Sequence, residues 1–267
     1  MGKPIYLQMT ENWTAEERSY FPESSFHHLS ATGSTNDDLS KLLKDGDGGN
    51  FTLVVADFQD SGRGRRGDRW EAAAGRNLLF SVAIALGENR EHWTRIPLET
   101  AMVVGEALES VLEPGTRIEA KWPNDIFLQG RKLGGILVET ILNPGPYAII
   151  GVGLNINVRR EEIPAELHDI AISLYEVLEC ESSRWYILEL IMRNWIELKT
   201  NKDANFEEVI DWLRNRDFLK GKPMHVQMSN GEIQGKGAGF GDRGELLVEI
   251  PNGEVKSIVS AEKISLC

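Results

Sequence analysis

The feature that most constrains this 267-residue chain is a loop in which glycine alternates with arginine, at residues 62–67 (GRGRRG). The loop lies between two apolar runs, residues 51–58 (FTLVVADF) and 77–86 (NLLFSVAIAL), whose composition is typical of buried strands. Glycines allow a backbone to expose its N–H groups, and arginines add positive charge that does not titrate away. The loop therefore predicts binding of a compact polyanion such as a nucleotide phosphate.

The net charge of −12 argues against a general nucleic-acid-binding protein, which needs a basic face. Against this acidic background, arginines at positions 63, 65, 66 and 69 form a local cluster. A solvated basic loop is the alternative interpretation, but solubility does not need the interleaved glycines. The spacing differs from that of a Walker A loop, because no Gly-Lys-Ser/Thr follows.

The apolar periodicity predicts both helices and strands. Helices are expected directly after Ser34-Thr35-Asn36, a segment that would cap the first of them, and at 95–112, 184–199 and 205–215. Besides the two runs named above, strands are expected at about 117–122, 133–142 and 147–156. From residue 218 onward, eight glycines and Asn-Gly turns at 230–231 and 252–253 predict a small all-β domain, which we expect to be a barrel.

A second polar segment, residues 121–125 (KWPND), precedes a lysine beside a Gly-Gly pair at residues 132–136 (KLGGI). In the simplest arrangement the two pieces form a hairpin, with Asp125 and Lys132 facing one pocket. Asp125 would then orient Lys132 or accept a proton from an incoming amine. Two alternatives stay open at this point: Asp125 caps its own turn, and Lys132 is a solvated surface lysine.

In their order along the chain, the motifs resemble the signature of the biotin protein ligases, also called biotin–[acetyl-CoA-carboxylase] ligases, over about residues 26–267. The matching motifs are Ser34-Thr35-Asn36, Gln59, 62–67, Trp70, 121–125, 132–137 and 151–155 (GVGLN). The resemblance implies an α+β fold, with a mixed β-sheet and flanking helices similar to a class II aminoacyl-tRNA synthetase core. It also implies an N-terminal extension at 1–25, a catalytic domain at 26–217 and a C-terminal SH3-like β-barrel at 218–267.

The same resemblance implies a two-step ligase reaction that uses biotin, ATP and Mg²⁺. The biotin carboxylate attacks the α-phosphorus of ATP, which releases pyrophosphate and leaves biotinyl-5′-AMP. A lysine of a biotin carboxyl carrier protein then attacks the acyl carbon, giving an amide and AMP. The catalytic residues implied are Lys132, Arg65 and Asp125, and no residue is assigned as a metal ligand.

The resemblance also assigns binding residues. The biotin side comprises Ser34, Thr35, Asn36, Gln59, Gly62, Arg63, Lys132 and Gly134. The ATP and adenylate side comprises Arg65, Arg66, Trp70, Asn124, Lys132 and Asn155. Structural alternatives stay open for Trp70 as a core residue, Thr35 as part of a helix cap and Asn155 as a turn residue.

Several further expectations follow. No helix-turn-helix segment precedes residue 26, so we expect no operator DNA binding. No apolar run approaches the ~20 residues that span a bilayer, and no signal peptide is recognisable, which favours a cytoplasmic protein without a membrane partner. With only two cysteines, Cys180 and Cys267, we expect no structural disulfide. The resemblance implies a homodimer, and the alternative functions are a lipoate–protein ligase-like enzyme and a catalytically inactive biotin-binding regulator.

Overall fold

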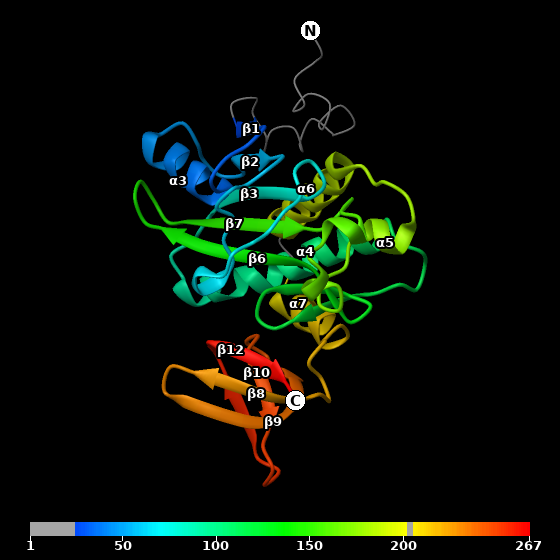
Figure 1. The fold of residues 1–267 in the computed structure, drawn as a ribbon. Coiled ribbons are helices and arrows are strands. Elements are labelled where there is room, and N and C mark those ends of the chain that lie inside the picture. Colours follow the sequence, from blue (N-terminus) through cyan, green and yellow to red (C-terminus); the bar gives the residue numbers. More distant parts are fainter. Residues whose placement is uncertain (1–24, 202–204) are drawn as a thin grey trace.

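The computed structural model describes residues 25–201 and 205–267 and contains two β-sheets with associated helices (Figure 1). The larger sheet has seven strands in the order β1-β2-β3-β7-β6-β5-β4. Only β1 and β2 run parallel, and the other neighbours are antiparallel. This mixed sheet confirms the predicted α+β class. Its strands are β1 (Phe26–Leu29), β2 (Leu53–Ala56), β3 (Leu78–Ala85), β4 (Ile118–Lys121), β5 (Asp125–Leu128), β6 (Arg131–Ile141) and β7 (Tyr147–Leu154).

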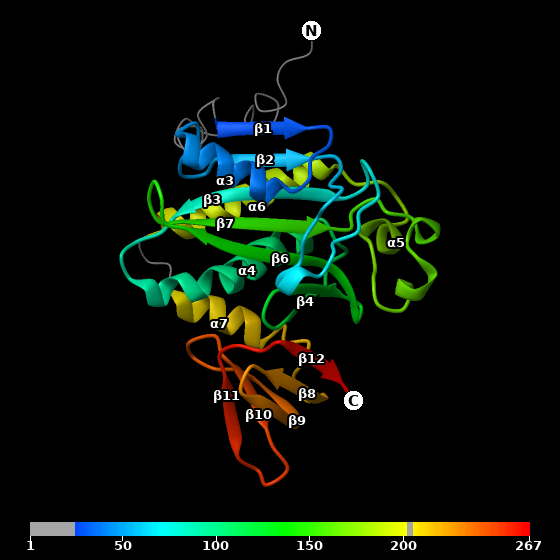
Figure 2. The same cartoon turned by 60° about the vertical axis from the view of Figure 1, so that its left-hand side comes forward.

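Helices cover both faces of this sheet (Figures 1 and 2). Helices α4 (Ile96–Glu109) and α6 (Arg184–Thr200) pack on one face, and α3 (Thr35–Asp45) packs on the other. On β3, Phe80 and Val82 join the core under α4 and α6, whereas Ala83 joins Leu39 and Leu43 of α3. The alternation follows from the two-residue period of a strand, which sends neighbouring side chains to opposite faces.

The α3 face of the sheet is short of side chains at its centre. Gly153 pairs with Gly135 of β6, and Gly151 pairs with Ser81 of β3. A Cβ added at Gly153 would lie 2.7 Å from Trp70 Cε2, and one added at Gly151 would lie 2.4 Å from Asn36 Oδ1. We call Gly135, Gly151 and Gly153 the glycine floor, because it allows side chains from distant segments to lie directly on the backbone.

The second sheet is antiparallel and has the strand order β11-β10-β9-β8-β12. Its strands are β8 (Pro223–Met228), β9 (Gly231–Phe240), β10 (Leu246–Glu249), β11 (Val255–Ile258) and β12 (Lys263–Leu266). The two Asn-Gly turns predicted from the sequence join β8 to β9 and β10 to β11. The all-β prediction is therefore confirmed, whereas closure into an SH3-like barrel and the boundary at 218 stay predictions.

The two sheets contact each other through a few specific residues. Trp122 Nε1, in the turn between β4 and β5, donates a hydrogen bond to the carbonyl oxygen of Gly244 at 3.0 Å. The ring centroids of Phe127 on β5 and Phe218, which precedes β8, lie 4.2 Å apart with the rings tilted by 36°. Helix α7 (Phe206–Arg214) contacts both α4 and β9, so it also joins the two sheets (Figure 2). These contacts hold the second sheet beside the strands that carry the KWPND segment.

Most predicted elements are confirmed, with ends displaced by a few residues. The apolar pattern did not predict β1, β5 or the short helix α5 (Leu174–Leu178). Helix α3 begins at Thr35, inside the segment 34–36 that we expected to cap it, and Ser34 at the N-cap position makes no side-chain capping hydrogen bond, so the predicted side-chain cap is wrong. Cys180 and Cys267 are free and exposed, as expected. Almost all of the predicted N-terminal extension, residues 1–24, lies outside the described residues.

Within residues 25–201 and 205–267, no helix combines the length and the apolar character that crossing a membrane requires.

The contact between α4 and α7 yields a prediction about Gly105, inside α4. Alanine normally stabilises a helix interior relative to glycine by about 0.5–1 kcal/mol. Here an added Cβ would lie 2.4 Å from Trp212 Cζ2 of α7. We therefore expect Gly105→Ala to lower the free energy of unfolding by about 1–3 kcal/mol in urea titrations, as overpacking does.

Gly87→Ala is the matched control, because an added Cβ there meets no atom within 4 Å. It should leave the urea midpoint almost unchanged. A Gly105→Ala variant more stable than wild type would show that α7 does not hold Trp212 against α4.

Candidate active site

A cavity of about 260 Å³ lies over the glycine floor, bounded by the arginine–glycine loop, the start of α3 and the start of β12. Most of the residues predicted for the site line it. They are Ser34, Thr35, Asn36, Gln59, Arg63, Arg65, Arg66, Trp70, Asn124, Asp125 and Lys132. The fold thus brings together motifs that are spread over about half of the sequence, although the roles assigned to them stay predictions.

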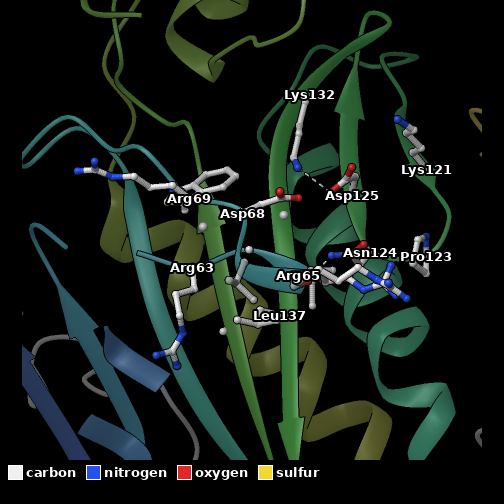
Figure 3. A pocket seen from close by; sticks show the side chains of 18 of the residues that line it. Arg63, Arg65, Asp68, Arg69, Lys121, Pro123, Asn124, Asp125, Lys132 and Leu137 are labelled. Carbon is white, nitrogen blue, oxygen red and sulfur yellow. Dashed lines mark hydrogen bonds and ion pairs between the residues drawn. The ribbon is translucent and has the colours of Figure 1, made fainter. Parts of the chain in front are cut away.

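Lys132 and Asp125 meet in this cavity. Lys132 Nζ lies 2.8 Å from Asp125 Oδ1 and 5.7 Å from the centroid of the Trp70 ring. Figure 3 shows the two charged groups pointing toward one another from neighbouring strands β6 and β5. The predicted hairpin is therefore confirmed. Lys132 is about one-third exposed and held by a carboxylate, which rules out a freely solvated surface lysine.

A shift in strand register sets the direction of the Lys132 side chain. In the β5–β6 ladder, Ile126 pairs with Gly134 but Phe127 pairs with Lys132, so one residue of β6 is skipped. In a regular strand, Lys132 and Gly135 would face opposite sides of the sheet because they are three residues apart. With the extra residue they share a face, and a Cβ added at Gly135 would lie 3.6 Å from Lys132 Cε. The Gly-Gly pair is the sequence signal for such an irregularity.

The arginine–glycine loop folds back on itself over the cavity. Gly64 N–H donates to the carbonyl oxygen of Asp68 at 2.7 Å, and Trp70 N–H donates to that of Gly62 at 2.9 Å. These bonds close the loop and set Trp70 flat against the glycine floor. Trp70 therefore lines the cavity on its sheet side rather than belonging to the core under α4 and α6.

The three arginines of the loop have different surroundings. The guanidinium of Arg63 binds both carboxylate oxygens of Asp37 at 2.7 Å, and Arg66 Nη1 lies 3.1 Å from Glu262 Oε1. Arg65 is partly buried and has no ion-pair partner in the described part of the chain. Burial, together with repulsion by Arg66, lowers the pKa of Arg65. Arg65 is thus the loop cation placed to receive an anion (Figure 3).

The other end of the cavity is a set of buried polar groups at the start of α3. Thr35 N–H donates to Gln59 Oε1 at 2.8 Å, and Asn36 Nδ2 donates to Glu139 Oε2 at 2.6 Å. Ser81 Oγ lies 2.6 Å from both Thr35 Oγ1 and Asn36 Oδ1. The sequence predicted no role for Ser81 or Glu139. Their only signals are that Ser81 is polar within an otherwise apolar strand and that Glu139 follows the apolar residues 136–138 of β6.

Lys121 is another cavity residue without a predicted role. It stands opposite Asp125 in the β4–β5 ladder, and its ammonium lies 5.4 Å from the centroid of the Phe127 ring. Burial lowers the pKa of Lys121, against the opposing attraction of Asp125.

Three of the predicted binding residues do not line the cavity. A Cβ added at Gly62 would lie 2.8 Å from the Trp70 carbonyl oxygen, and one at Gly134 would lie 2.6 Å from that of Gly153. Asn155 Oδ1 accepts a hydrogen bond from Asn77 at 2.9 Å, and its Nδ2 donates to the Ile172 carbonyl oxygen at 3.1 Å. In this structure these residues pack the loop and the strand ends that surround the cavity.

Comparison with known proteins agrees with this arrangement. The model of the biotin/lipoate A/B protein ligase family matches residues 30–157. The bifunctional ligase/repressor BirA of Bacillus spizizenii is 31% identical over 79% of this chain, which spans 65% of the length of that protein. The biotin–[acetyl-CoA-carboxylase] ligase of Mycobacterium tuberculosis is 28% identical, over 83% of this chain and 82% of the relative.

A solved structure extends the similarity to the whole described fold. The biotin protein ligase from Aquifex aeolicus, in complex with biotin and ATP, superimposes with a TM-score of 0.77 and 30% sequence identity. The match covers 91% of this chain and 99% of the Aquifex chain. The chain therefore belongs to the biotin/lipoate A/B protein ligase family and, within it, to the biotin protein ligases.

Proposed function

We propose that the protein activates biotin with ATP to biotinyl-5′-AMP and transfers the biotin to a lysine of a biotin carboxyl carrier protein. The observation that carries this proposal is a single cavity with buried hydrogen-bonding groups at one end and Lys132 and Arg65 at the other. Such a cavity fits a ligand that has a polar head, an apolar chain and a carboxylate. The Aquifex aeolicus relative, whose structure contains biotin and ATP, supports the same assignment.

Biotin would lie in the cavity above the glycine floor. Its ureido ring would contact Thr35 and Gln59, and its hydrocarbon chain would run along the side of the Trp70 ring that faces the cavity, since an aromatic face suits an apolar chain. The carboxylate would then reach Lys132. Because the glycine floor has no side chains, Trp70 lies directly on the sheet and leaves room for the chain above it.

In the first step the carboxylate oxygen attacks the α-phosphorus, and the bond from that phosphorus to pyrophosphate breaks. The main barrier is repulsion between a carboxylate and a polyphosphate. Lys132, held in place by Asp125, and Arg65 neutralise the charge that develops at the α-phosphate. Asn124, which lines the same end of the cavity, would contact the nucleotide.

In the second step the amine of the acceptor lysine attacks the acyl carbon. The bond between the acyl carbon and the phosphate oxygen breaks, AMP leaves, and the attacking nitrogen loses a proton. Asp125 would accept this proton, at the oxygen that does not hold Lys132. The reaction requires no protein nucleophile.

Mg²⁺ would accompany the nucleotide and supply further neutralisation of phosphate charge. Magnesium commonly binds substrate phosphates and waters with only one or two protein carboxylates. Among the residues that the structure describes, no three His, Cys, Asp or Glu side chains form a group that could hold a metal ion. The cavity suits this mode of binding: the carboxylates that line it, Asp68, Asp125 and Glu262, would supply one or two ligands, and the phosphates and waters would supply the rest.

The direct test is pyrophosphate release from ATP and magnesium, measured without a carrier protein. Release with biotin but not with lipoate would support the proposal. Release with lipoate alone would assign the protein to the lipoate ligases, and release with neither from folded protein would favour a binding-only regulator. The homodimer, the SH3-like barrel and the class II synthetase-like core belong to the same proposal, and sedimentation analysis tests the homodimer.

Lys132→Ala should lower the rate of biotin-dependent pyrophosphate release by ~10²-fold or more, because the variant lacks the ammonium that screens the reacting anions. Single-turnover measurement of pyrophosphate isolates this step. Lys44→Ala, on the exposed end of α3, is the matched control and should react like wild type. A Lys132→Ala rate equal to that of the control would remove Lys132 from the mechanism.

Arg65→Gly should increase the dissociation rate of biotinyl-5′-AMP by about tenfold or more, since a hydrogen bond to a charged group contributes about 1.5–3 kcal/mol. Released adenylate would label bystander lysines on an added inert protein, detected by streptavidin blotting. Arg65→Ala separates the side chain from added backbone freedom and should give the same result. If Arg65→Ala behaves like the exposed-site control Arg117→Ala, retention does not depend on this guanidinium.

A further inference from the structure

A continuous series of short contacts runs from Glu139 on β6 into the polar end of the cavity. It joins the side chains of Glu139, Asn36, Ser81 and Thr35, with successive polar atoms 2.6 Å apart. We call these four residues the hydrogen-bond chain. Asn36 is 3% exposed and Ser81 is fully buried, so water does not compete with the inner bonds of the chain, whereas the Glu139 carboxylate at its outer end is 43% exposed.

The chemistry of the four groups fixes which atom donates at each link. A carboxylate accepts hydrogen bonds and donates none, so the Asn36 amide must turn its NH₂ group toward Glu139. The Asn36 carbonyl oxygen then faces Ser81 and can only accept. Ser81 therefore donates its single hydroxyl proton to Asn36. The 2.6 Å contact between Ser81 and Thr35 still needs a proton, and Thr35 is the group that can supply it.

Thr35 consequently has no proton left for a ligand. Its hydroxyl oxygen lies 3.1 Å from Gln59 Oε1, a longer contact than the one to Ser81. Gln59 Oε1 already accepts the Thr35 backbone N–H at 2.8 Å. The hydroxyl oxygen of Thr35 therefore presents a lone pair to the cavity, and the Gln59 amide keeps its NH₂ group as a donor.

We propose that Glu139 is a positioning residue that selects ligands by setting the direction of this hydrogen-bond chain, so that Thr35 accepts a hydrogen bond from a ligand N–H. An acceptor beside a donor matches the N–H and C=O of a cyclic urea. This inference rests on the proposed function, because it explains how the cavity would distinguish the ureido ring of biotin. Glu139 itself touches no ligand in this arrangement.

The charged groups around Glu139 keep its carboxylate in place. Arg63 Nη2 of the arginine–glycine loop lies 3.5 Å from Glu139 Oε2 and also binds Asp37. Arg63 thus balances two carboxylates, and it connects the loop that covers the cavity to the group that orders its polar end.

The test uses Glu139→Gln, which keeps the shape of the side chain but can donate as well as accept. In this variant the Asn36 amide can turn over, the order of donors reverses, and Thr35 can offer its proton to the cavity. The probes are biotin and its two cyclic carbamate analogues. In each analogue a different one of the two ureido N–H groups is replaced by oxygen. Calorimetric binding without ATP measures recognition apart from catalysis.

Wild type should bind biotin at least ~10-fold more tightly than the analogue that lacks the N–H facing Thr35, because two lone pairs would otherwise meet. Glu139→Gln should reduce this preference to less than about threefold. Asp37→Asn is the matched control: it removes the same charge from the same arginine but lies outside the hydrogen-bond chain, and it should keep the wild-type preference.

Thr35→Val provides a second measurement if thermal unfolding shows that Glu139→Gln is not folded. The Thr35→Val variant should bind biotin and the analogue equally, because it lacks the hydroxyl acceptor. Full preference in folded Glu139→Gln, or in Thr35→Val, would overturn the inference while leaving biotin binding intact. Equal binding of biotin and both analogues by wild type would overturn it too. Failure of wild type to bind biotin at all would instead overturn the proposed function, and the inference with it.

Discussion

The candidate site depends on the absence of three side chains from the middle of a sheet. Glycine inside a strand is unfavourable by about 0.5–1 kcal/mol relative to alanine, and the glycine floor contains three such residues. A methyl group at Gly151 would collide with Asn36, and one at Gly153 would collide with Trp70. The cavity, the position of the Trp70 ring and the placement of Asn36 in the hydrogen-bond chain all depend on these missing side chains, at the expense of local stability. The opposite face, packed under α4 and α6, has no comparable gap in its apolar side chains.

The arginine–glycine loop divides its charge among three tasks. Arg63 is neutralised by acidic side chains of α3 and β6, Arg66 reaches a glutamate next to the second sheet, and Arg65 stays directed at the cavity. Two of the arginines therefore connect the loop to its surroundings, and one is left for an anion. The carboxylates of Asp37, Glu139 and Glu262, rather than a single ligand, therefore offset the mutual repulsion of the loop arginines.

The sequence predicts the parts of this structure whose signal is local. Helices α4 and α6 repeat their apolar residues over three or more turns, whereas β1 and β5 are four residues long and show no period. The pairing of Lys132 with Asp125 is predictable, because both residues flank one short hairpin. The link from Asn36 to Glu139 is not, since 103 residues separate them and only the sheet order brings β6 beside β7 and near α3.

The skipped residue in β6 makes the register of one short segment as important as its composition. If β5 and β6 paired regularly beyond Ile126, Leu133 would stand opposite Phe127. Lys132 would then point toward the apolar core under α4, and the Leu133 side chain would point toward the cavity. Substitutions in this segment change the site gradually, but a slip of the pairing by one residue would replace a cation with an apolar side chain without disrupting the sheet. The turn between β10 and β11 has no such constraint, because none of its residues lines the cavity.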